Sequence, residues 1–498
     1  MFLTLDVGTT AVKAGLFDEK LNLLHIQIEE YELLCREGGR VEQSPKAYWE
    51  KTVQAVRHLL RGREKAAAQI RTITCTTQGE TLIPVDKQGN ALSDAVVWLD
   101  SRASREAEQI KAGIDPLSFY RRTGQPEITG SMPLCKLVWF RENRRELYEK
   151  TWKFLLLEDY LVFLLCKKTC SNPSLMSSTG YFDVIQGGVW GEILDMAGID
   201  RAKIPEIQPC GTILGRISRE AAAELGISQS ACIVTGAMDQ AASAVGAGNL
   251  EPGMVTETTG TCQTVLCTCQ SPEIRKLSPL TYYCHGISGK YLKLIYSETA
   301  GMALKWFRRE FCADLMKEEK SFEQMSALAE KEPILSRGVI FYPHMAGTQI
   351  PRADSRARGV FWGAGLDSTR GTFVRAIMEG VGYLLRENLE AMGEEPERIT
   401  ALGGGAKSPV WCRIKAGICG IPVVTQENAE STSLGAAILG AAAAGEYGSV
   451  HEASEQIRKG AVFQPDREQM EKYKAGYETY KRMYWAFEPL YGKGGEEL

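Results

Sequence analysis

The sequence predicts an α/β protein built as two related halves. A strand at residues 2–6, a Gly/Thr turn at 7–10 and a strand at 11–17 open the chain, and a strand at 21–28 follows. The same pattern returns as a strand at 255–258, a turn at 259–261 and a strand at 263–267. Such internal repetition is typical of a duplicated architecture. A segment dense in Gly with one Pro, 246–253, marks the boundary, so we expect domains at 1–248 and 249–498.

Length and composition describe a folded globular protein of more than one domain. The chain has 498 residues, of which 44% are hydrophobic and 24% charged. A net charge of -4 and the absence of a long basic run argue against a nucleic-acid partner. The 14 Cys lack the spacing of a zinc site, no signal peptide precedes Phe2, and no apolar run reaches the roughly 20 residues of a membrane span. We therefore expect a cytoplasmic protein with reduced thiols and no membrane partner.

Polar residues follow the strands of the first half. Ser44 and Pro45 begin a helix over 45–60, and a strand over 70–76 then delivers Gln78 and Glu80 to its carboxyl end. In open α/β sheets ligands usually bind at that end. Strands over 82–85 and 95–99 follow, and the second closes on Trp98 and its neighbours.

This group suits a sugar pocket, with an aromatic face for the carbon chain and polar groups for hydroxyls. The alternative is a salt-bridged loop with Trp98 in the core, and for Trp98 the two interpretations stay open. For Gln78 and Glu80 binding is favoured. The candidate sugar-binding residues are Gln78, Glu80, Trp98, Asp100 and Arg102.

The next stretch, 103–198, is mainly helical, with helices at 134–143, 156–165 and 190–197, and suits a cap on the substrate side. A short helix capped by Ser218 and stopped by Gly226 leads to a buried strand over 231–235. Asp239 follows at the start of a helix, where the helix dipole favours its ionised form. An ionised carboxylate there can accept a hydroxyl proton as the oxygen attacks phosphorus, whereas the plain alternative is a helix N-cap.

Both hairpin turns predict phosphate-binding loops. Backbone N–H groups and Thr hydroxyls in a tight turn form a small anion-binding nest, and Asp6 at the first strand's end would face the accompanying cation. Turn geometry alone also explains Gly and Thr in one hairpin, so the recurrence carries the prediction. The residues concerned are Gly8, Thr9, Thr10, Gly260 and Thr261.

Later elements of the second half add a glycine-rich turn. Helices are expected at 298–307, entered through Gly301, and at 367–392, ending before Gly393. A strand at 399–402 leads into three glycines, 403–405, and a helix at about 410–418. Three glycines let a flat ring or a ribose approach the backbone closely. A helix at 433–444, rich in small residues, is expected to pack behind this turn.

Taken in order, these stretches resemble the FGGY carbohydrate kinases, such as xylulose, ribulose and glycerol kinases. The resemblance runs from Leu5 to about Gly445. It rests on LDVGTT at 5–10, WLDSR at 98–102, GAMDQ at 236–240, TGT at 259–261, AGMALKW at 300–306 and GGGA at 403–406. It implies an actin-like ATPase fold of two RNase H-like domains, with ATP and Mg²⁺ in a cleft between them and the sugar mainly against the first.

The resemblance also implies residue roles. Asp239 is then the catalytic base, and Asp6 lies on the side of the metal. The ATP contacts are Gly8, Thr9, Thr10, Lys13, Gly260, Thr261, Gly301, Gly404, Gly405 and Ser408. The sugar contacts are Asp239 and Gln240 together with the five residues named above. Homodimers occur in this family, so a homodimer is compatible with the resemblance.

Departures from relatives bear on the substrate. Gly79 stands where glycerol kinases carry an Arg, and Ser131 where they place a Tyr before the Lys matching Lys136. Both changes predict a larger pocket and a longer substrate. Gly79 and Glu80 also replace the Met-His pair of typical xylulose kinases. Pro409 and Ala364 replace an Asn and an aliphatic residue of relatives.

The sequence thus predicts an ATP-dependent kinase acting on a primary hydroxyl of a pentulose such as xylulose or ribulose. A polyol such as erythritol or glycerol is the alternative substrate. A non-catalytic actin-like ATP-binding sensor is the alternative of another class, and Asp239, Asp6 and the polar pocket argue against it.

Overall fold

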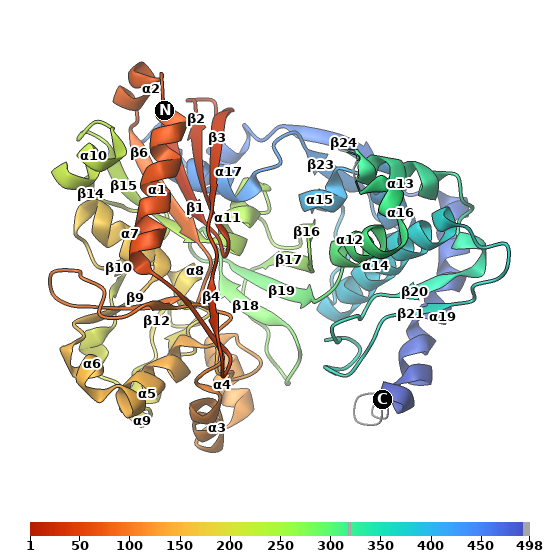
Figure 1. Cartoon of the computed structure of the whole chain (residues 1–498), viewed down its shortest axis with the longest axis horizontal. Coiled ribbons are helices and arrows are strands. Elements are labelled where there is room, and N and C mark those ends of the chain that lie inside the picture. Colours follow the sequence, from red (N-terminus) through yellow and green to blue (C-terminus); the bar gives the residue numbers. More distant parts are fainter. Residues whose placement is uncertain (317, 319, 492–498) are drawn as a thin grey trace. The chain divides into compact units, whose positions relative to one another are not determined.

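The structure is a computed structural model that describes residues 1–316, 318 and 320–491 (Figure 1). The chain divides into two compact units. Unit 1 comprises Met1–Leu250, Cys269–Leu292 and Glu430–Ile457, and unit 2 comprises Glu251–Thr268, Lys293–Ala429 and the described residues from Arg458 on. The first change of unit falls inside the predicted boundary segment, but no composition signal predicts the two later segments that return to unit 1.

The central sheet of unit 1 has the strand order β14-β15-β6-β1-β2-β3. β1 pairs antiparallel with β2 and parallel with β6, and β15 pairs parallel with β6. The predicted opening hairpin and third strand are therefore confirmed. The strand bounds are β1 (Phe2–Val7), β2 (Ala11–Phe17), β3 (Leu23–Glu30), β6 (Thr72–Thr77), β14 (Ile213–Arg216) and β15 (Cys232–Met238).

Helices cover both faces of this sheet. Every residue of β1 and β6 is buried, because α1 (Pro45–Leu60) packs against β2 and β3, while α17 (Ser431–Ala443) packs against β1 and β6. Figure 1 shows α1 running alongside the red strands of the opening hairpin. Pro45 starts α1 as predicted, although the Ser44 side chain makes no cap hydrogen bond.

The prediction that the small-residue helix packs behind the glycine turn of the second half is wrong. That helix is α17, which belongs to unit 1 and packs on α11 (Asp239–Gly246). The approach is close: a Cβ on Gly435 would lie 1.8 Å from Ala242 O, and one on Gly246 would lie 1.8 Å from Ser431 O. The small residues do permit close packing, but their partner is the helix that carries Asp239.

The rest of unit 1 contains a second sheet of order β4-β5-β8-β7-β9 and the mainly helical region predicted for 103–198. The predicted second pocket strand shortens to two residues, so Trp98 lies in a turn. Strands are β4 (Leu34–Arg36), β5 (Arg40–Gln43), β7 (Leu82–Val85), β8 (Ala95–Val96), β9 (Lys153–Leu156), β10 (Cys170–Ser171), β11 (Phe182–Asp183), β12 (Gly188–Val189), β13 (Glu206–Ile207) and β18 (Thr281–Cys284). Helices are α2 (Glu64–Ala68), α3 (Ser104–Ala112), α4 (Pro116–Thr123), α5 (Pro133–Asn143), α6 (Arg145–Lys150), α7 (Leu157–Cys166), α8 (Pro173–Met176), α9 (Gly191–Met196), η1 (Arg201–Lys203), α10 (Arg219–Leu225) and α18 (Val450–Ser454).

The sheet of unit 2 repeats the order of the first, as β19-β17-β16-β22-β23-β24. Its β16–β17 hairpin is antiparallel, β22 runs parallel to β16, β23 parallel to β22 and β24 antiparallel to β23. The predicted duplication is therefore seen in the strand order as well as in the hairpins. The bounds are β16 (Val255–Thr259), β17 (Gln263–Cys269), β19 (Tyr291–Ser297), β22 (Ile399–Leu402), β23 (Val423–Gln426) and β24 (Lys459–Phe463).

The remaining elements of unit 2 build a core of aromatic and aliphatic side chains around α14 (Arg370–Met392), α16 (Pro409–Cys419) and α19 (Arg467–Tyr491). Gly393 ends α14 in the left-handed conformation, as its position predicts. The other elements are α12 (Gly301–Phe311), η2 (Ala313–Leu315), α13 (Ser321–Glu330), η3 (Ser336–Gly338), β20 (Ile340–Tyr342), β21 (Val360–Trp362) and α15 (Gly403–Ala406).

Two composition-based expectations concern thiols and membranes. All the cysteines are free thiols, and none forms a disulfide. In the part of the chain that the structure describes, no helix has the length and apolar character needed to span a bilayer.

Candidate active site

Asp239 stands at the carboxyl end of β15, after an irregularity in that strand. The register with β6 shifts between Val234 and Ala237. Two side chains fix the backbone here: Glu158 Oε1 accepts the Gly236 N–H at 2.9 Å, and Ser174 Oγ accepts the Met238 N–H at 3.0 Å. The Glu158 and Ser174 side chains therefore fix the backbone that leads to Asp239.

Asp239 is not the N-cap of its helix. The cap position belongs to Met238, and Asp239 is the first residue of α11, with Oδ1 accepting the Gln240 N–H at 2.7 Å. The N-cap alternative is thus not supported, and Oδ2 makes no hydrogen bond within the described residues.

Burial sets the charge state of Asp239 more than the helix dipole does. Burial and then the neighbouring Asp6 carboxylate raise the pKa of Asp239 from 3.8 to about 7. The predicted stabilisation of the ionised form by the helix start is therefore outweighed. A carboxyl group with a pKa near 7 exchanges protons readily near neutral pH, as a general base requires.

Asp6 lies at the end of β1, directly opposite Lys13 of β2. The Lys13 ammonium nevertheless pairs with Glu430 at 2.7 Å, and no described residue donates a hydrogen bond to the Asp6 carboxylate. Burial, offset in part by Lys13, raises the pKa of Asp6 to about 6. Asp6 is thus a nearly buried carboxylate without a bonded partner beside Asp239.

The Gly8–Thr10 turn is closed by a residue that sequence reasoning missed. The Tyr31 hydroxyl donates to Gly8 O, and the Tyr31 N–H donates to Thr10 O at 2.9 Å. Tyr31 also meets Tyr48 edge-on at 5.3 Å, and Gln78 Nε2 donates to the Tyr48 hydroxyl at 3.3 Å. Two tyrosines therefore connect the predicted phosphate turn with the predicted sugar pocket.

Glu80 lies near enough to Asp239 for the two carboxyl groups to interact, and Gln78 precedes Glu80 by two residues. Gln78 is buried, and its Oε1 has no hydrogen-bond partner among the described residues. Glu80 adopts a φ of 63°, which is uncommon for a non-glycine residue and often marks a functional site. Burial raises the pKa of Glu80 to about 7, with Lys136 opposing and Asp239 adding to the rise.

Trp98 is not in the core. Its side chain is 39% exposed, and its indole N–H donates to Thr9 Oγ1 at 3.0 Å. Of the two interpretations left open by the sequence, the structure favours an accessible aromatic face. The contact also joins the predicted sugar residue to the predicted phosphate turn, and it leaves the Thr9 O–H free to donate.

Unlike Trp98, Asp100 and Arg102 have buried side chains that form an ion pair. Asp100 is fully buried and accepts hydrogen bonds from the Val41 N–H at 2.6 Å and from Arg102, which also binds Glu42 at 2.7 Å. Arg102 further lies over the Trp139 ring at 5.0 Å. These contacts match the salt-bridged loop considered as the alternative, so we assign both residues to the support of the Trp98 turn.

The room predicted from Gly79 is partly filled. A Cβ at Gly79 would lie 3.1 Å from Ser178 Oγ and 3.2 Å from Met238 Sδ. A larger side chain at this position would have to displace one of them. Ser178 and Met238 therefore leave little room for the arginine that glycerol kinases carry at this position. The Ser131 hydroxyl shares a hydrogen bond with Thr129 Oγ1 at 2.8 Å.

Tyr283 of β18 is a second residue that the sequence did not indicate. Its pKa is raised by burial and by the carboxylates of Glu80 and Asp239, and the Gln125 side chain opposes this rise. β18 is fixed beside α8 through the Cys284 N–H, which donates to Ser177 Oγ at 2.9 Å. Because β18 comes from the returning segment 269–292, only tertiary structure brings Tyr283 to this group.

In unit 2 the predicted nucleotide residues gather around one turn. A Cβ on Gly301 would lie 2.3 Å from Gly260 O, and a Cβ on Gly405 would lie 2.6 Å from Thr259 Cβ. Thr261 O accepts the N–H groups of Ala300 and Met302 at 3.0 and 3.1 Å. The glycines at these positions thus permit a close approach of two segments, around Gly301 and around Gly405, to the hairpin turn. Ser408 lies farther along, as the N-cap of α16, with Oγ accepting the Trp411 N–H.

A buried ion pair lies beneath this turn. Lys415 Nζ lies 2.7 Å from Glu257 Oε2 and donates to Thr259 Oγ1 at 2.8 Å, and both charged side chains have no exposed surface. Gln263 Nε2 also donates to Glu257 Oε1 at 3.0 Å. Sequence reasoning missed this pair because α16 follows the strand of the hairpin by about 150 residues.

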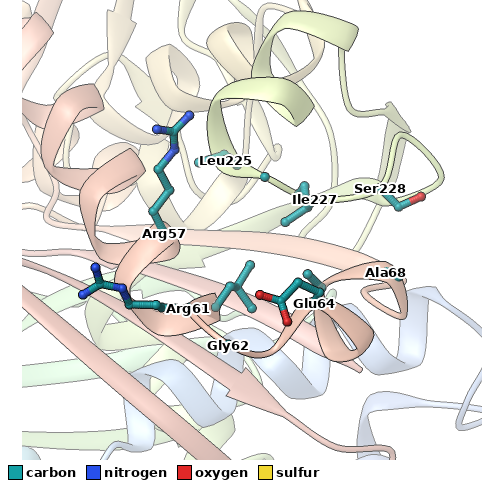
Figure 2. A pocket seen from close by; sticks show the side chains of 11 residues that line it. Arg57, Arg61, Gly62, Glu64, Ala68, Leu225, Ile227 and Ser228 are labelled. Carbon is teal, nitrogen blue, oxygen red and sulfur yellow. The ribbon is translucent and has the colours of Figure 1, made fainter.

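Two surface grooves lie away from these groups. One of about 400 Å³ lies between the end of α1, α2 and the turn after α10, and its lining includes Arg57, Arg61, Glu64, Leu225 and Ile227 (Figure 2). Another, of about 510 Å³, lies in unit 2 between α13, α14, α16 and α19. Neither is lined by a predicted site residue.

Comparison with known proteins assigns the family. Residues 1–246 match the N-terminal domain of the FGGY family of carbohydrate kinases, and residues 278–444 match its C-terminal domain. The chain belongs to the FGGY family of carbohydrate kinases.

Individual FGGY proteins are similar to this chain over nearly the whole length of both. A xylulose kinase of Bacillus subtilis is 28% identical over 96% of both chains, and a gluconokinase of the same species is 27% identical over 91% of this chain and 90% of its own. The solved structure described as a xyloylose kinase from Brucella ovis has a TM-score of 0.89 at 26% identity, over 98% of this chain and 99% of its own. The chain is therefore a carbohydrate kinase with the actin-like ATPase fold of this family.

FGGY kinases use ATP, and each unit, taken by itself, has features that suit part of such a ligand. A Cβ on Gly260 would meet no described atom within 4 Å, so the turn offers open space next to its backbone. Asp6 is a carboxylate without a bonded partner. No group of three or more His, Cys, Asp or Glu that could enclose a metal exists among the described residues. A carboxylate such as Asp6 suits Mg²⁺, which is commonly held by one or two carboxylates together with substrate phosphates.

Proposed function

We propose that this FGGY kinase phosphorylates a primary hydroxyl of a neutral pentulose, such as xylulose or ribulose. ATP supplies the γ-phosphoryl group. Asp239 orients the hydroxyl and takes its proton through the unbonded Oδ2, while Gln78, Glu80, Trp98 and Gln240 bind the sugar chain.

The charges around Asp239 carry the proposal for a neutral substrate. Glu80 and Asp239 contribute carboxyl groups to the pocket, and two cations of the same unit are engaged elsewhere. Lys136 donates to two backbone carbonyls, and Arg102 is bound to Asp100 and Glu42. An aldonate such as gluconate would bring its carboxylate toward like charges, which is unfavourable in a partly buried site. The similarity to xylulose kinases agrees with this choice, whereas the similarity to gluconokinases does not.

We propose that each hairpin turn contributes phosphate contacts within its own unit. Gly8, Thr9, Thr10 and Lys13 would contact phosphates in unit 1, and Asp6 would hold Mg²⁺. In unit 2 the contacts would come from Gly260, Thr261, Gly301, Gly404, Gly405 and Ser408. We propose accordingly that residues 1–248 mainly bind the sugar and 249–498 the nucleotide, with β18 and α17 as additions to the first part.

A polyol remains the second candidate, because Glu80, Gln78 and Asp239 bind hydroxyls and none of them recognises a keto group specifically. The non-catalytic sensor is disfavoured, since a sensor needs no hydroxyl-binding residues beside Asp239.

A coupled assay of ADP release tests the substrate. The panel consists of xylulose, ribulose, erythritol, glycerol and gluconate, each at several concentrations. We expect the highest kcat/KM for one of the two pentuloses and at least about a hundredfold lower value for gluconate, equivalent to about 2.7 kcal/mol. A preference for gluconate contradicts the charge argument, and no stimulation by any compound supports the sensor.

A further inference from the structure

Lys136 is a buried cation outside the residues assigned above. It lies on α5 with no exposed surface. Its Nζ donates to Val97 O at 2.9 Å and to Glu80 O at 3.2 Å, and no carboxylate forms an ion pair with it in the described part of the chain. A buried ammonium held only by backbone carbonyls is unusual, because burial penalises its charge.

The two carbonyls belong to the two segments of the sugar pocket. Glu80 O is the carbonyl of the residue with φ 63°, between β6 and β7. Val97 O also accepts the Asp100 N–H at 2.9 Å and so closes the turn that exposes Trp98. One ammonium group therefore joins the strained backbone at Glu80 to the Trp98 turn.

A strained residue keeps its conformation only when its surroundings hold it. Beside Glu80, the Thr81 N–H donates to Gly79 O at 2.7 Å, so the chain turns tightly here. An aliphatic side chain at position 136 would fill the same space but would leave both carbonyls without this donor. The charged side chain therefore contributes hydrogen bonds that fix the positions of two backbone segments, and packing alone does not require its charge.

We infer that Lys136 is a positioning residue, which fixes the Glu80 backbone and the Trp98 turn in the arrangement that binds the sugar. Lys136 does not touch the sugar itself. This inference rests on the proposed function, because it concerns the sugar subsite of the same kinase.

The test is Lys136→Met, with Lys153→Met as a matched control. Lys153 Nζ likewise donates to two backbone carbonyls, those of Ala202 at 2.8 Å and Ile204 at 2.7 Å, but neither segment carries a predicted site residue. For Lys136→Met we expect the sugar KM to rise by about tenfold or more, the magnitude of a lost charge-assisted hydrogen bond, with the KM for ATP within about twofold. For Lys153→Met both KM values should stay within about twofold. An unchanged sugar KM in Lys136→Met, or equal rises in both KM values, overturns the inference.

A second measurement uses the wild type and needs no variant. Burial lowers the pKa of Lys136 to about 8, against the raising effect of Glu80 and Asp100, and Arg102 adds to the lowering. The neighbouring Cys135, whose own pKa burial raises to about 12, also raises the pKa of Lys136, and Asp239 raises the pKa of Glu80. Since Glu80 and Asp239 titrate near 7, a loss of sugar affinity between pH 8 and 9.5 reports Lys136. We expect calorimetric sugar affinity to fall over that range while ATP affinity stays level. A sugar affinity that stays constant from pH 8 to the ordinary lysine pKa of 10.5 overturns the inference.

The two proposals fail in different ways. A wild type that phosphorylates no sugar of the panel refutes the proposed function. A wild type that is active, with Lys136→Met equal to it in sugar KM, refutes only the role of Lys136.

Discussion

The replacement Asp239→Asn should remove activity and stabilise the protein at the same time. The amide is nearly isosteric, and its oxygen can still accept the Gln240 N–H. It cannot take a hydroxyl proton, so we expect sugar-dependent turnover to fall by about 10²–10⁴-fold, the usual contribution of a general base. ATP binding should persist because Asp239 is not among the proposed ATP contacts.

The stability gain follows from the raised pKa of Asp239. Folding moves this pKa from 3.8 to about 7, so the folded chain holds the proton more tightly and ionisation costs stability. The cost begins above the unfolded pKa, grows as pH rises and is complete above the folded pKa. At about 1.4 kcal/mol per pKa unit it amounts to about 1.5 kcal/mol at pH 5 and about 4 kcal/mol at pH 8.

The assay is urea unfolding of the variant and the wild type at pH 5 and pH 8. Comparison at each pH cancels the titration of groups common to both proteins. The variant should be more stable at pH 8, and its advantage should exceed that at pH 5 by about 2–3 kcal/mol. An advantage that does not change with pH, or a less stable variant at pH 8, would refute the reasoning about burial.

Two further predictions concern pH and the nucleotide turn. Because Asp239 must be ionised to act as the base and its pKa is about 7, kcat/KM for the sugar should rise about tenfold from pH 6 to pH 8; a profile level across this range, measured by direct ADP quantification, contradicts the assignment. Lys415→Met leaves the Glu257 carboxylate buried without its cation. The free energy of unfolding of unit 2 should therefore fall by about 3–5 kcal/mol, and ADP affinity should fall. The double replacement Glu257→Gln with Lys415→Met should recover part of the stability, and no recovery would show that the charge was not the cause.

Local sequence patterns predict much of this fold. The Gly/Thr hairpins, the Ser218 cap, the Gly226 and Gly393 helix ends and the strand before Asp239 all agree with the structure. Each depends on residues adjacent in the chain, where turn and capping chemistry acts directly.

What the sequence does not predict depends on contacts between distant segments. α17 contacts α11 rather than the glycine turn, because a stripe of small residues permits close packing without specifying the partner. Tyr283 and Glu430 reach the neighbourhood of Asp239 and Lys13 only because their segments return to unit 1.

In the site, too, local patterns predict some residues, and the roles of others depend on contacts in the folded chain. The sequence pattern places Gln78, Glu80 and Asp239 correctly at strand ends, where polar residues collect. The same pattern does not distinguish these three residues from Asp100 and Arg102, whose side chains bind each other in a buried ion pair. Burial and charge pairing decide between these roles, and both are properties of the folded chain.

The most direct test of the account measures ADP and sugar phosphate together. Wild type and Asp239→Asn are incubated with ATP, Mg²⁺ and the best pentulose of the panel, and both products are quantified. The account predicts equimolar ADP and pentulose phosphate from the wild type, and at least about a hundredfold less of both from the variant. ADP release at the same rate without sugar, or sugar phosphate formed undiminished by Asp239→Asn, would contradict it.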